Sequence, residues 1–100
     1  MKTHNGLVRC HPGGILKRQY LDPLGLSAGT LAQNLGVPRT RIERIVAETS
    51  GISADSAARL GRFFGTSSQF WLNLQVAWEL ANLPEGVVEE INNIQPIKAA

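Results

Sequence analysis

Apolar residues recur at helical spacing along most of this 100-residue chain, and no two segments alternate polar and apolar residues as paired strands would. The pattern predicts an all-α fold with five helices and room for a short sixth near the C-terminus. The residues expected on the buried faces of the first four helices are, in chain order, Ile15, Leu16 and Tyr20; Leu31, Ala32 and Leu35; Ile42, Ile45 and Val46; and Ala57, Leu60, Phe63 and Phe64.

Two of these helices lie close together in residues 27–46 and are joined at Gly36-Val37-Pro38. Ser27 is a suitable N-cap for the first of them, and Gly36 can adopt the left-handed conformation that ends it. Pro38 can occupy the first turn of the second helix, where its missing N–H costs nothing. Two helices joined by a short turn that contains glycine are typical of the helix-turn-helix.

The second helix of this pair has a basic outer surface in its first two turns, formed by Arg39, Thr40, Arg41 and Arg44. In DNA-binding proteins with a helix-turn-helix, the first residues of the second helix contact base edges, and arginine pairs bidentately with guanine. The candidate DNA-binding residues are therefore Arg39, Thr40, Arg41, Arg44, Ser27 and Pro38. The alternative is a solvated charged face on an ordinary helical bundle.

The remaining helices have recognisable boundaries. A first helix is predicted from Pro12 to about Leu21, where Asp22-Pro23 stops it, and both Leu24 and Leu26 are expected in the core. Residues 47–52 are predicted to form a loop. The other expected boundaries are Ser53 as N-cap and Gly65 as the end of the fourth helix, and Thr66 or Ser67 as N-cap of the fifth.

The fifth helix is apolar around nearly its whole circumference, although a surface helix in a monomer of this size needs only one apolar face. The excess apolar surface predicts a homodimer interface that contains Trp71, Leu74 and Trp78. The alternative is that the C-terminal tail folds back over this surface, since apolar residues between 87 and 94 also have helical spacing.

The chain is long enough for one domain, and we divide it into a flexible N-terminal arm (1–10), a helix-turn-helix domain (11–82) and a C-terminal tail (83–100). Residues 1–44 carry seven basic and two acidic side chains, a net charge of +5, whereas residues 45–100 carry three basic and six acidic ones, a net charge of −3. A molecule of this kind would turn its basic half towards phosphate, unless the asymmetry is chance. No apolar run approaches the ~20 residues that span a bilayer, and a cytoplasmic location is expected.

Candidate catalytic and metal-binding residues are few. A single cysteine, Cys10, excludes an intrachain disulfide, and its proximity to His11 and His4 does not reproduce the usual spacing of metal ligands. Glu89 and Glu90 are neighbours on one predicted helix, so their side chains diverge. The chain has neither a phosphate-binding loop nor a catalytic Ser, His and Asp motif. We therefore expect no metal, no cofactor and no enzymatic activity.

Six distinct sequence blocks follow one another along the chain: HPGGIL at 11–16, LGLS at 24–27, GVP at 36–38 followed by Arg41-Ile42, ISADSA at 52–57, FGTS at 64–67 and FWLNLQ at 70–75. In these blocks and their spacing the chain resembles the HigA/VapI antitoxin family of lambda-repressor-like DNA-binding proteins. The resemblance covers roughly residues 11–80. It departs from the family at Gly14, where glutamate is usual, and at Glu48-Thr49-Ser50, where a basic segment is usual.

The resemblance implies a five-helix, lambda-repressor-like domain that acts as a sequence-specific DNA-binding antitoxin and transcriptional autorepressor of a HigBA-type toxin–antitoxin module. It also implies three partners: double-stranded operator DNA, a second copy of the chain, and a cognate toxin, by analogy an RNA-cleaving one. The acidic loop at Glu48 weakens the expected contact with the DNA backbone. The alternatives are a stand-alone regulator of the same fold without a toxin, and a helical protein-interaction module that does not bind DNA.

Overall fold

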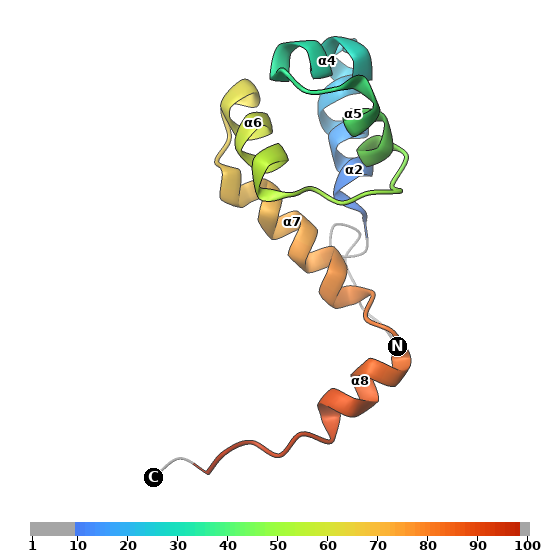
Figure 1. The fold of residues 1–100 in the computed structure, drawn as a ribbon, viewed down its shortest axis with the longest axis vertical. Coiled ribbons are helices and arrows are strands. Elements are labelled where there is room, and N and C mark those ends of the chain that lie inside the picture. The colour runs from blue at the N-terminus through green and yellow to red at the C-terminus, as the bar shows by residue number, and fades with distance from the viewer. Residues whose placement is uncertain (1–9, 99–100) are drawn as a thin grey trace.

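The computed structural model describes residues 10–98, which are helical without strands; of the predicted N-terminal arm, all but Cys10 lies outside the described residues. The elements are α2 (Pro12–Ile15), the π-helical segment η1 (Leu16–Leu21), α3 (Asp22–Leu24), α4 (Ala28–Leu35), α5 (Arg39–Val46), α6 (Ala54–Phe64), α7 (Ser68–Ala81) and α8 (Glu85–Asn92). Because α2, η1 and α3 follow one another without a break, they form a single first helix (Figure 1). The predicted all-α fold, with five helices and a short sixth, is confirmed.

The first helix continues through Asp22-Pro23, where the sequence predicts a stop, and ends only at Gly25, which has a φ of 62°. The turn before Pro23 is π-helical, and the N–H of Asp22 donates to the carbonyl oxygen of Lys17, five residues back. A proline ring disrupts an α-helix because it clashes with the preceding turn and has no N–H to donate. The wider π turn gives the ring of Pro23 room, so the helix passes through it.

The two helices of residues 27–46 have the predicted boundaries. The Ser27 hydroxyl accepts a hydrogen bond from the Thr30 N–H at 3.1 Å and so caps α4. Gly36 has a φ of 72° and ends α4. Pro38, predicted in the first turn of α5, is instead its N-cap, one residue before the helix begins at Arg39. The predicted geometry of the two helices and their turn is therefore confirmed.

The core lies where the first helix and α4 to α7 meet (Figure 1). Two residues that were expected in it are exposed: Leu24 by 60% and Phe63 by 39%. Leu24 stays outside because its helix continues past Pro23. Phe63 stays outside because its neighbour Phe64 takes the inward position, with its ring centroid 4.8 Å from that of Tyr20. The fully buried side chains include Leu16, Leu31, Ile42, Ile45, Leu60 and Trp71.

Helix α7 has apolar side chains both on the side that faces the core and on the side that faces solvent. Trp71 is fully buried in the core, and its indole N–H donates to the Thr66 hydroxyl at 2.8 Å. The prediction that Trp71 lies in a homodimer interface is therefore wrong, because this side chain is already covered within its own protomer. The apolar side chains that α7 leaves exposed are Phe70 (36%), Val76 (50%) and Leu80 (66%).

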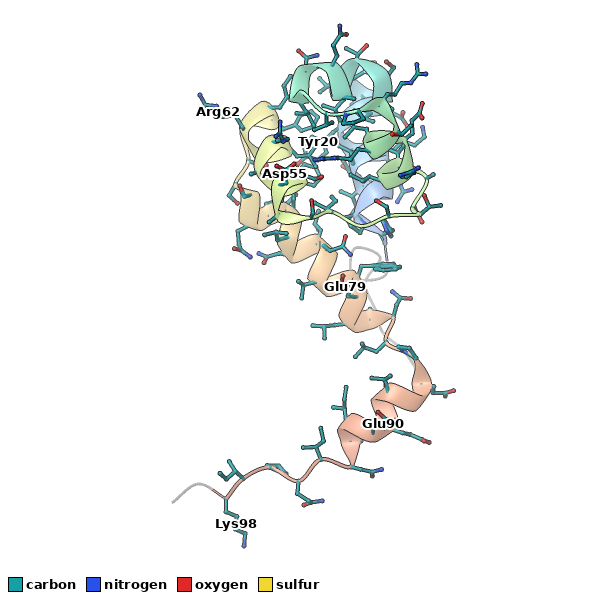
Figure 2. The ribbon with its side chains drawn as sticks, in the orientation of Figure 1. Tyr20, Asp55, Arg62, Glu79, Glu90 and Lys98 are labelled. Atoms are coloured by element: carbon teal, nitrogen blue, oxygen red, sulfur yellow. The ribbon has the colours of Figure 1, made fainter. Side chains whose placement is uncertain are left out.

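The tail extends away from the rest of the molecule, and α8 lies beyond the end of α7 (Figure 1). Every residue from 84 to 98 is exposed, and side chains such as Glu90 and Lys98 project into solvent (Figure 2). The short sixth helix is present, but it does not fold back over α7. The apolar outer side of α7 therefore stays open in the single protomer.

Candidate nucleic-acid interface

Helix α5 has a buried side and an outer side. Ile42 and Ile45 are fully buried, which fixes the orientation of the helix about its own axis. Thr40, Glu43 and Arg44 are spaced i, i+3 and i+4, so they share one face of the helix, and all three are exposed on the side away from the core. These three residues form what we call the outer face of α5.

The two arginines on the flanks of α5 are each held by a carboxylate. Arg39 pairs with Glu43 one turn later, with 3.3 Å between the Nε and Oε2 atoms. Arg41, which is partly buried, donates through Nη1 to Oδ2 of Asp55 on α6. Both pairs are well exposed to solvent, so each contributes little to stability. These two ion pairs instead fix where the predicted DNA-binding side chains of Arg39 and Arg41 lie.

Arg44 differs from its two neighbours. Within residues 10–98 its guanidinium forms neither a hydrogen bond nor an ion pair, and its side chain is exposed on the outer face. Arginine keeps its charge at every physiological pH and offers a planar set of five N–H donors. Of the three arginines, Arg44 is thus the one that needs no exchange of partners before it meets a ligand.

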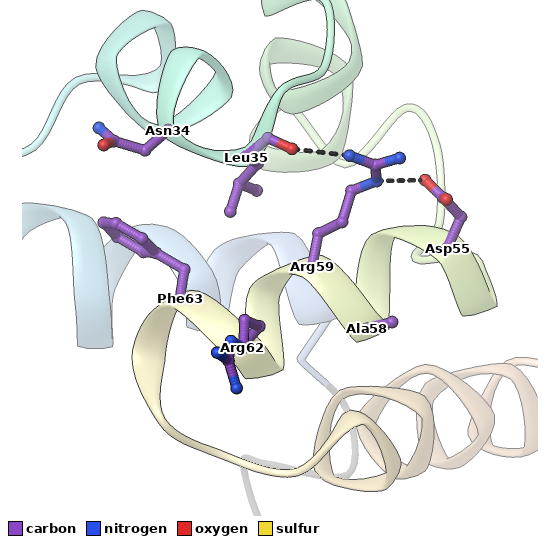
Figure 3. A pocket seen from close by; sticks show the side chains of 7 residues that line it. All are labelled: Asn34, Leu35, Asp55, Ala58, Arg59, Arg62 and Phe63. Atoms are coloured by element: carbon purple, nitrogen blue, oxygen red, sulfur yellow. Dashed lines mark hydrogen bonds and ion pairs between the residues drawn. The ribbon is translucent and has the colours of Figure 1, made fainter.

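Asp55 also holds Arg59 of its own helix α6, and Arg59 reaches the end of α4 (Figure 3). The Arg59 Nε donates to Asp55 Oδ2 at 3.0 Å, and its Nη1 donates to the carbonyl oxygen of Leu35 at 2.8 Å. The Leu35 carbonyl is one of the acceptors that the end of α4 leaves unpaired, and a basic side chain is favoured there. Hydrogen bonds from Arg41 and Arg59 hold the pKa of Asp55 below its usual value. The network ties α5 and α6 to the end of α4.

The start of α4 lies beside the start of α5. An open groove of about 700 Å³ runs between them and is lined by Ser27, Gly29, Thr30, Ala32, Gln33, Val37 and Arg39. A Cβ atom on Gly29 would lie 3.1 Å from Cδ of Arg39, so the glycine leaves room for the arginine stem. Pro38, the residue just before α5, is exposed. The groove therefore brings two predicted residues, Ser27 and Arg39, to one surface.

The loop after α5 is fixed at both ends. Glu48 has a φ of 65°, which allows the Thr49 N–H to donate back to the Arg44 carbonyl oxygen at 2.9 Å. This is the αL ending that glycine usually supplies. Further along, the Ile52 N–H donates to Oε1 of Gln75, a buried side chain on α7, at 2.8 Å. Helix α7 thus holds the loop that follows α5.

The two departures from the HigA/VapI pattern lie together in space. A Cβ atom on Gly14 would lie 2.8 Å from Oε2 of Glu48 and 2.9 Å from Nη1 of Arg18. The carboxylate of Glu48 therefore occupies the space beside α2 that a side chain at position 14 would fill. The acidic residue in the loop is directed towards the first helix.

His11 caps the first helix and supports α7. Its Nδ1 accepts a hydrogen bond from the Gly13 N–H at 2.9 Å, and its ring packs edge-on against Trp78 with 4.7 Å between centroids. Burial lowers the pKa of His11, although the nearby Glu48 carboxylate opposes this shift. Trp78 and Leu74, the other two residues of the predicted interface, are both partly buried. Part of the Trp78 side chain is therefore already covered within its own protomer.

Several residues of this surface were not found from the sequence. Asp55 and Arg59 are not among the predicted site residues, because no local pattern shows that Asp55 meets Arg41 fourteen positions away. Gly29 did carry a signal: glycine inside a helix is unfavourable and often indicates a close approach. Among the described residues no group of three His, Cys, Asp or Glu side chains could hold a metal ion. Nor is any described helix long and apolar enough to cross a membrane.

Comparison with known proteins agrees with this geometry. The model of the helix-turn-helix family matches residues 17–71. Virulence-associated protein I of Dichelobacter nodosus is 47% identical over 93% of this chain and 85% of its own length. The solved structure of Pseudomonas aeruginosa antitoxin HigA with the higBA promoter has a TM-score of 0.83 and 42% identity, and the match covers 90% of this chain and 99% of that one.

Antitoxin GraA in complex with its operator is similar to nearly the entire chain. The TM-score is 0.82 at 37% identity, and the match covers 98% of this chain and all of that one. Both structures contain DNA alongside a protein of this fold. From the family match, the identities and the shared architecture, the chain belongs to the helix-turn-helix family, in the HigA/VapI-type group whose motifs it carries.

Proposed function

We propose that this protein is a sequence-specific DNA-binding antitoxin that represses its own HigBA-type operon. The observation that carries the proposal is the exposed outer face of α5, with Arg39 and Arg41 on its flanks, on the second helix of a helix-turn-helix. Relatives with this fold have been solved with the higBA promoter and with an operator, which supports the same use of the surface here. The protein then acts in the cytoplasm, where the operon is transcribed.

In this proposal α5 enters the major groove with its N-terminal turns foremost. Arg44 and Thr40 face base edges, and Arg44 has the geometry to pair with guanine O6 and N7. The exposed first turn of α4, with Ser27 and Thr30, lies next to the start of α5 and contacts backbone phosphate, because helix N-termini attract anions. Arg41 contacts phosphate only when it leaves Asp55, so Asp55 competes with the DNA for this side chain.

Operator recognition also requires a second protomer. Two half-sites of a palindrome are about 34 Å apart, and one domain presents a single recognition helix. The open apolar side of α7 includes Val76 and Leu80, and α8 adds further exposed apolar residues, among them Val87 and Ile91. We propose that this surface contributes to a homodimer, because a two-fold axis can pair it with the same surface of another copy.

The antitoxin half of the proposal rests on relatives. The solved structure named above is an antitoxin HigA, and a second relative is antitoxin HigA-1 of Vibrio cholerae, 29% identical over 85% of this chain. A HigBA-type partner is a toxin, by family analogy one that cleaves RNA. No residue of this chain is assigned a catalytic role.

A binding assay on the promoter of the protein's own operon tests the DNA half. We expect the wild-type chain to protect one palindromic segment and to bind it at least 10³-fold more tightly than random DNA at physiological salt. Equal affinity for promoter and random duplexes would refute sequence-specific repression. Co-expression with the product of the adjoining gene tests the antitoxin half, which fails if this chain neither binds that product nor relieves its toxicity.

A further inference from the structure

An acidic residue forms part of the proposed DNA-reading surface. Glu43 is on the outer face of α5, on the same side of the helix as Arg39, and half of its side chain is exposed. A carboxylate in this position repels backbone phosphate and lowers affinity for DNA of any sequence. The other carboxylate that contacts α5, that of Asp55, comes from α6 and lies on the flank.

Glu43 is not alone on this face. Its Oε2 lies 3.3 Å from Nε of Arg39, whose stem passes over Gly29 at the start of α4. The pair places one acceptor group and one donor group side by side on neighbouring turns of the helix. Since both side chains are well exposed, the attraction between them is weak and each can turn to another partner.

The chemistry of the two groups restricts which bases they accept. An ionised carboxylate only accepts hydrogen bonds, and in the major groove the donors are the N4 amino group of cytosine and the N6 amino group of adenine. A guanidinium only donates, and guanine O6 and N7 are its best acceptors. Cytosine N4 and guanine O6 belong to the same base pair, so the C·G pair matches both groups at once.

We propose that Glu43 is a specificity-determining residue, which together with Arg39 reads a C·G base pair in each half-site. The inference rests on the proposed DNA-binding function. Before binding, the two groups form an exposed ion pair with each other. On the operator, the carboxylate turns to the cytosine amino group and the guanidinium turns to guanine. Where guanine or thymine replaces cytosine, the carboxylate meets an acceptor, and the mismatch raises the dissociation constant. Where adenine replaces it, the carboxylate still finds a donor, but the guanidinium loses its guanine.

The experiment is a selection from a pool of random 30-base-pair duplexes with the full-length wild-type protein, followed by the same selection with Glu43→Gln and Glu43→Ala. We expect the wild type to select a half-site with one position fixed as cytosine. Glutamine pairs bidentately with adenine N6 and N7, so Glu43→Gln should change the preferred base at that position from cytosine to adenine. Glu43→Ala should reduce the preference there by roughly tenfold.

Glu43→Ala should also bind random DNA more tightly, because a repulsive charge is gone. Glu90→Gln, which removes the same charge from the exposed helix α8, is the matched control and should select the wild-type sequence at every position. Circular dichroism should show that all variants are as helical as the wild type.

If both Glu43 variants select the wild-type sequence at every position, Glu43 does not read a base and the inference is overturned, while the DNA-binding function stands. If Glu43→Ala keeps the cytosine preference but Glu43→Gln loses it, the amide disturbs a contact made by another residue, which also overturns the inference. If the wild type selects no sequence at all, the proposed function fails together with the inference.

Discussion

The backbone of Gly13 lies so close to the carbonyl oxygen of Ile45 that a methyl group on Gly13 would overlap it. Gly13 is in the first turn of α2, and Ile45 is a fully buried residue near the end of α5. The neighbouring atoms are backbone, which cannot move aside as a flexible side chain can. This contact sets how closely the first helix approaches the helix that carries the candidate DNA-binding residues.

Gly13→Ala should therefore be strongly destabilising. Adding a methyl group to a tightly packed site typically costs 1 to 3 kcal/mol, and we expect a loss of about 3 kcal/mol in the free energy of unfolding. The matched control is Gly86→Ala in α8, where nothing lies within 4 Å and alanine should not destabilise. Urea denaturation of both variants checks the prediction, and equal stability would contradict the close contact.

Arg44→Ala should reduce sequence preference. Loss of a base contact is expected to cost about 1 to 3 kcal/mol on the operator and to relax specificity at one position. Arg41→Ala should weaken binding to all sequences alike or have little effect, because Arg41 is held by Asp55 on the flank. Binding of each variant to operator and to random duplexes separates these outcomes, and an unchanged preference in Arg44→Ala would remove Arg44 from base reading.

Asp55→Asn should free Arg41 for phosphate. The logarithm of the binding constant falls with the logarithm of salt concentration by about 0.9 per phosphate neutralised, so the slope should become steeper by about that amount in each protomer. Asn keeps the size of the side chain and removes its charge. A series of binding measurements from low to high salt gives the slope, and an unchanged slope would mean that Arg41 does not exchange Asp55 for DNA.

The ion pairs of Asp55 should also disappear in acid. Because Arg41 and Arg59 hold the pKa of this carboxyl below its usual value, the folded state binds a proton less readily than the unfolded state. The stabilisation that these ion pairs provide is fully present above pH 3.8, the usual pKa of this carboxyl, and is lost as the pH falls through its folded pKa. In Asp55→Asn, the denaturation midpoint should vary less over this acidic window than in the wild type.

His11 should make the protein less stable at mildly acidic pH. Burial lowers its folded pKa below the ordinary 6.5, so between the two values the unfolded state binds the proton and the folded state does not. The contribution of His11 to the free energy of unfolding is therefore fully present above pH 6.5 and declines as the pH falls towards the folded pKa. Urea midpoints between pH 5 and 8 measure this, and His11→Asn, which keeps an N-cap acceptor, should lack this contribution to the decline.

Leu80→Glu should give a folded monomer, whereas Trp78→Glu should lower stability. Leu80 is 66% exposed on the open side of α7, but Trp78 packs against His11 within the same protomer. Sedimentation and circular dichroism distinguish these effects, with Gln69→Glu as a control for a new charge at an exposed position of α7. A Leu80→Glu protein that remains dimeric would locate the interface elsewhere.

Local chemistry made the helix boundaries predictable. Ser27, Ser53 and Ser67 each accept a hydrogen bond from the N–H three residues later, as their positions before helical segments indicated. Gly36 and Gly65 have the positive φ values expected of them. These features depend on a few neighbouring residues, so they can be recognised without knowing the rest of the fold.

Contacts between residues far apart in the sequence could not be predicted from such local features. A helix that is apolar all round does not reveal which side meets the core, so Trp71 was assigned to the surface while Leu80 was not singled out. The pairing of Arg41 with Asp55 depends on how α6 packs against α5. The passage of the first helix through Pro23 depends on a π turn that periodicity does not show.

The Glu48 carboxylate lies beside Gly14, so substitutions at these two positions affect each other. A glutamate at position 14 would bring a second carboxylate to the place that Glu48 already occupies, and two like charges at that distance oppose each other's ionisation. A side chain at position 14 would require the ends of Glu48 and Arg18 to turn aside, and both are flexible and exposed. The effect of a substitution at position 14 therefore depends on which residue stands at position 48.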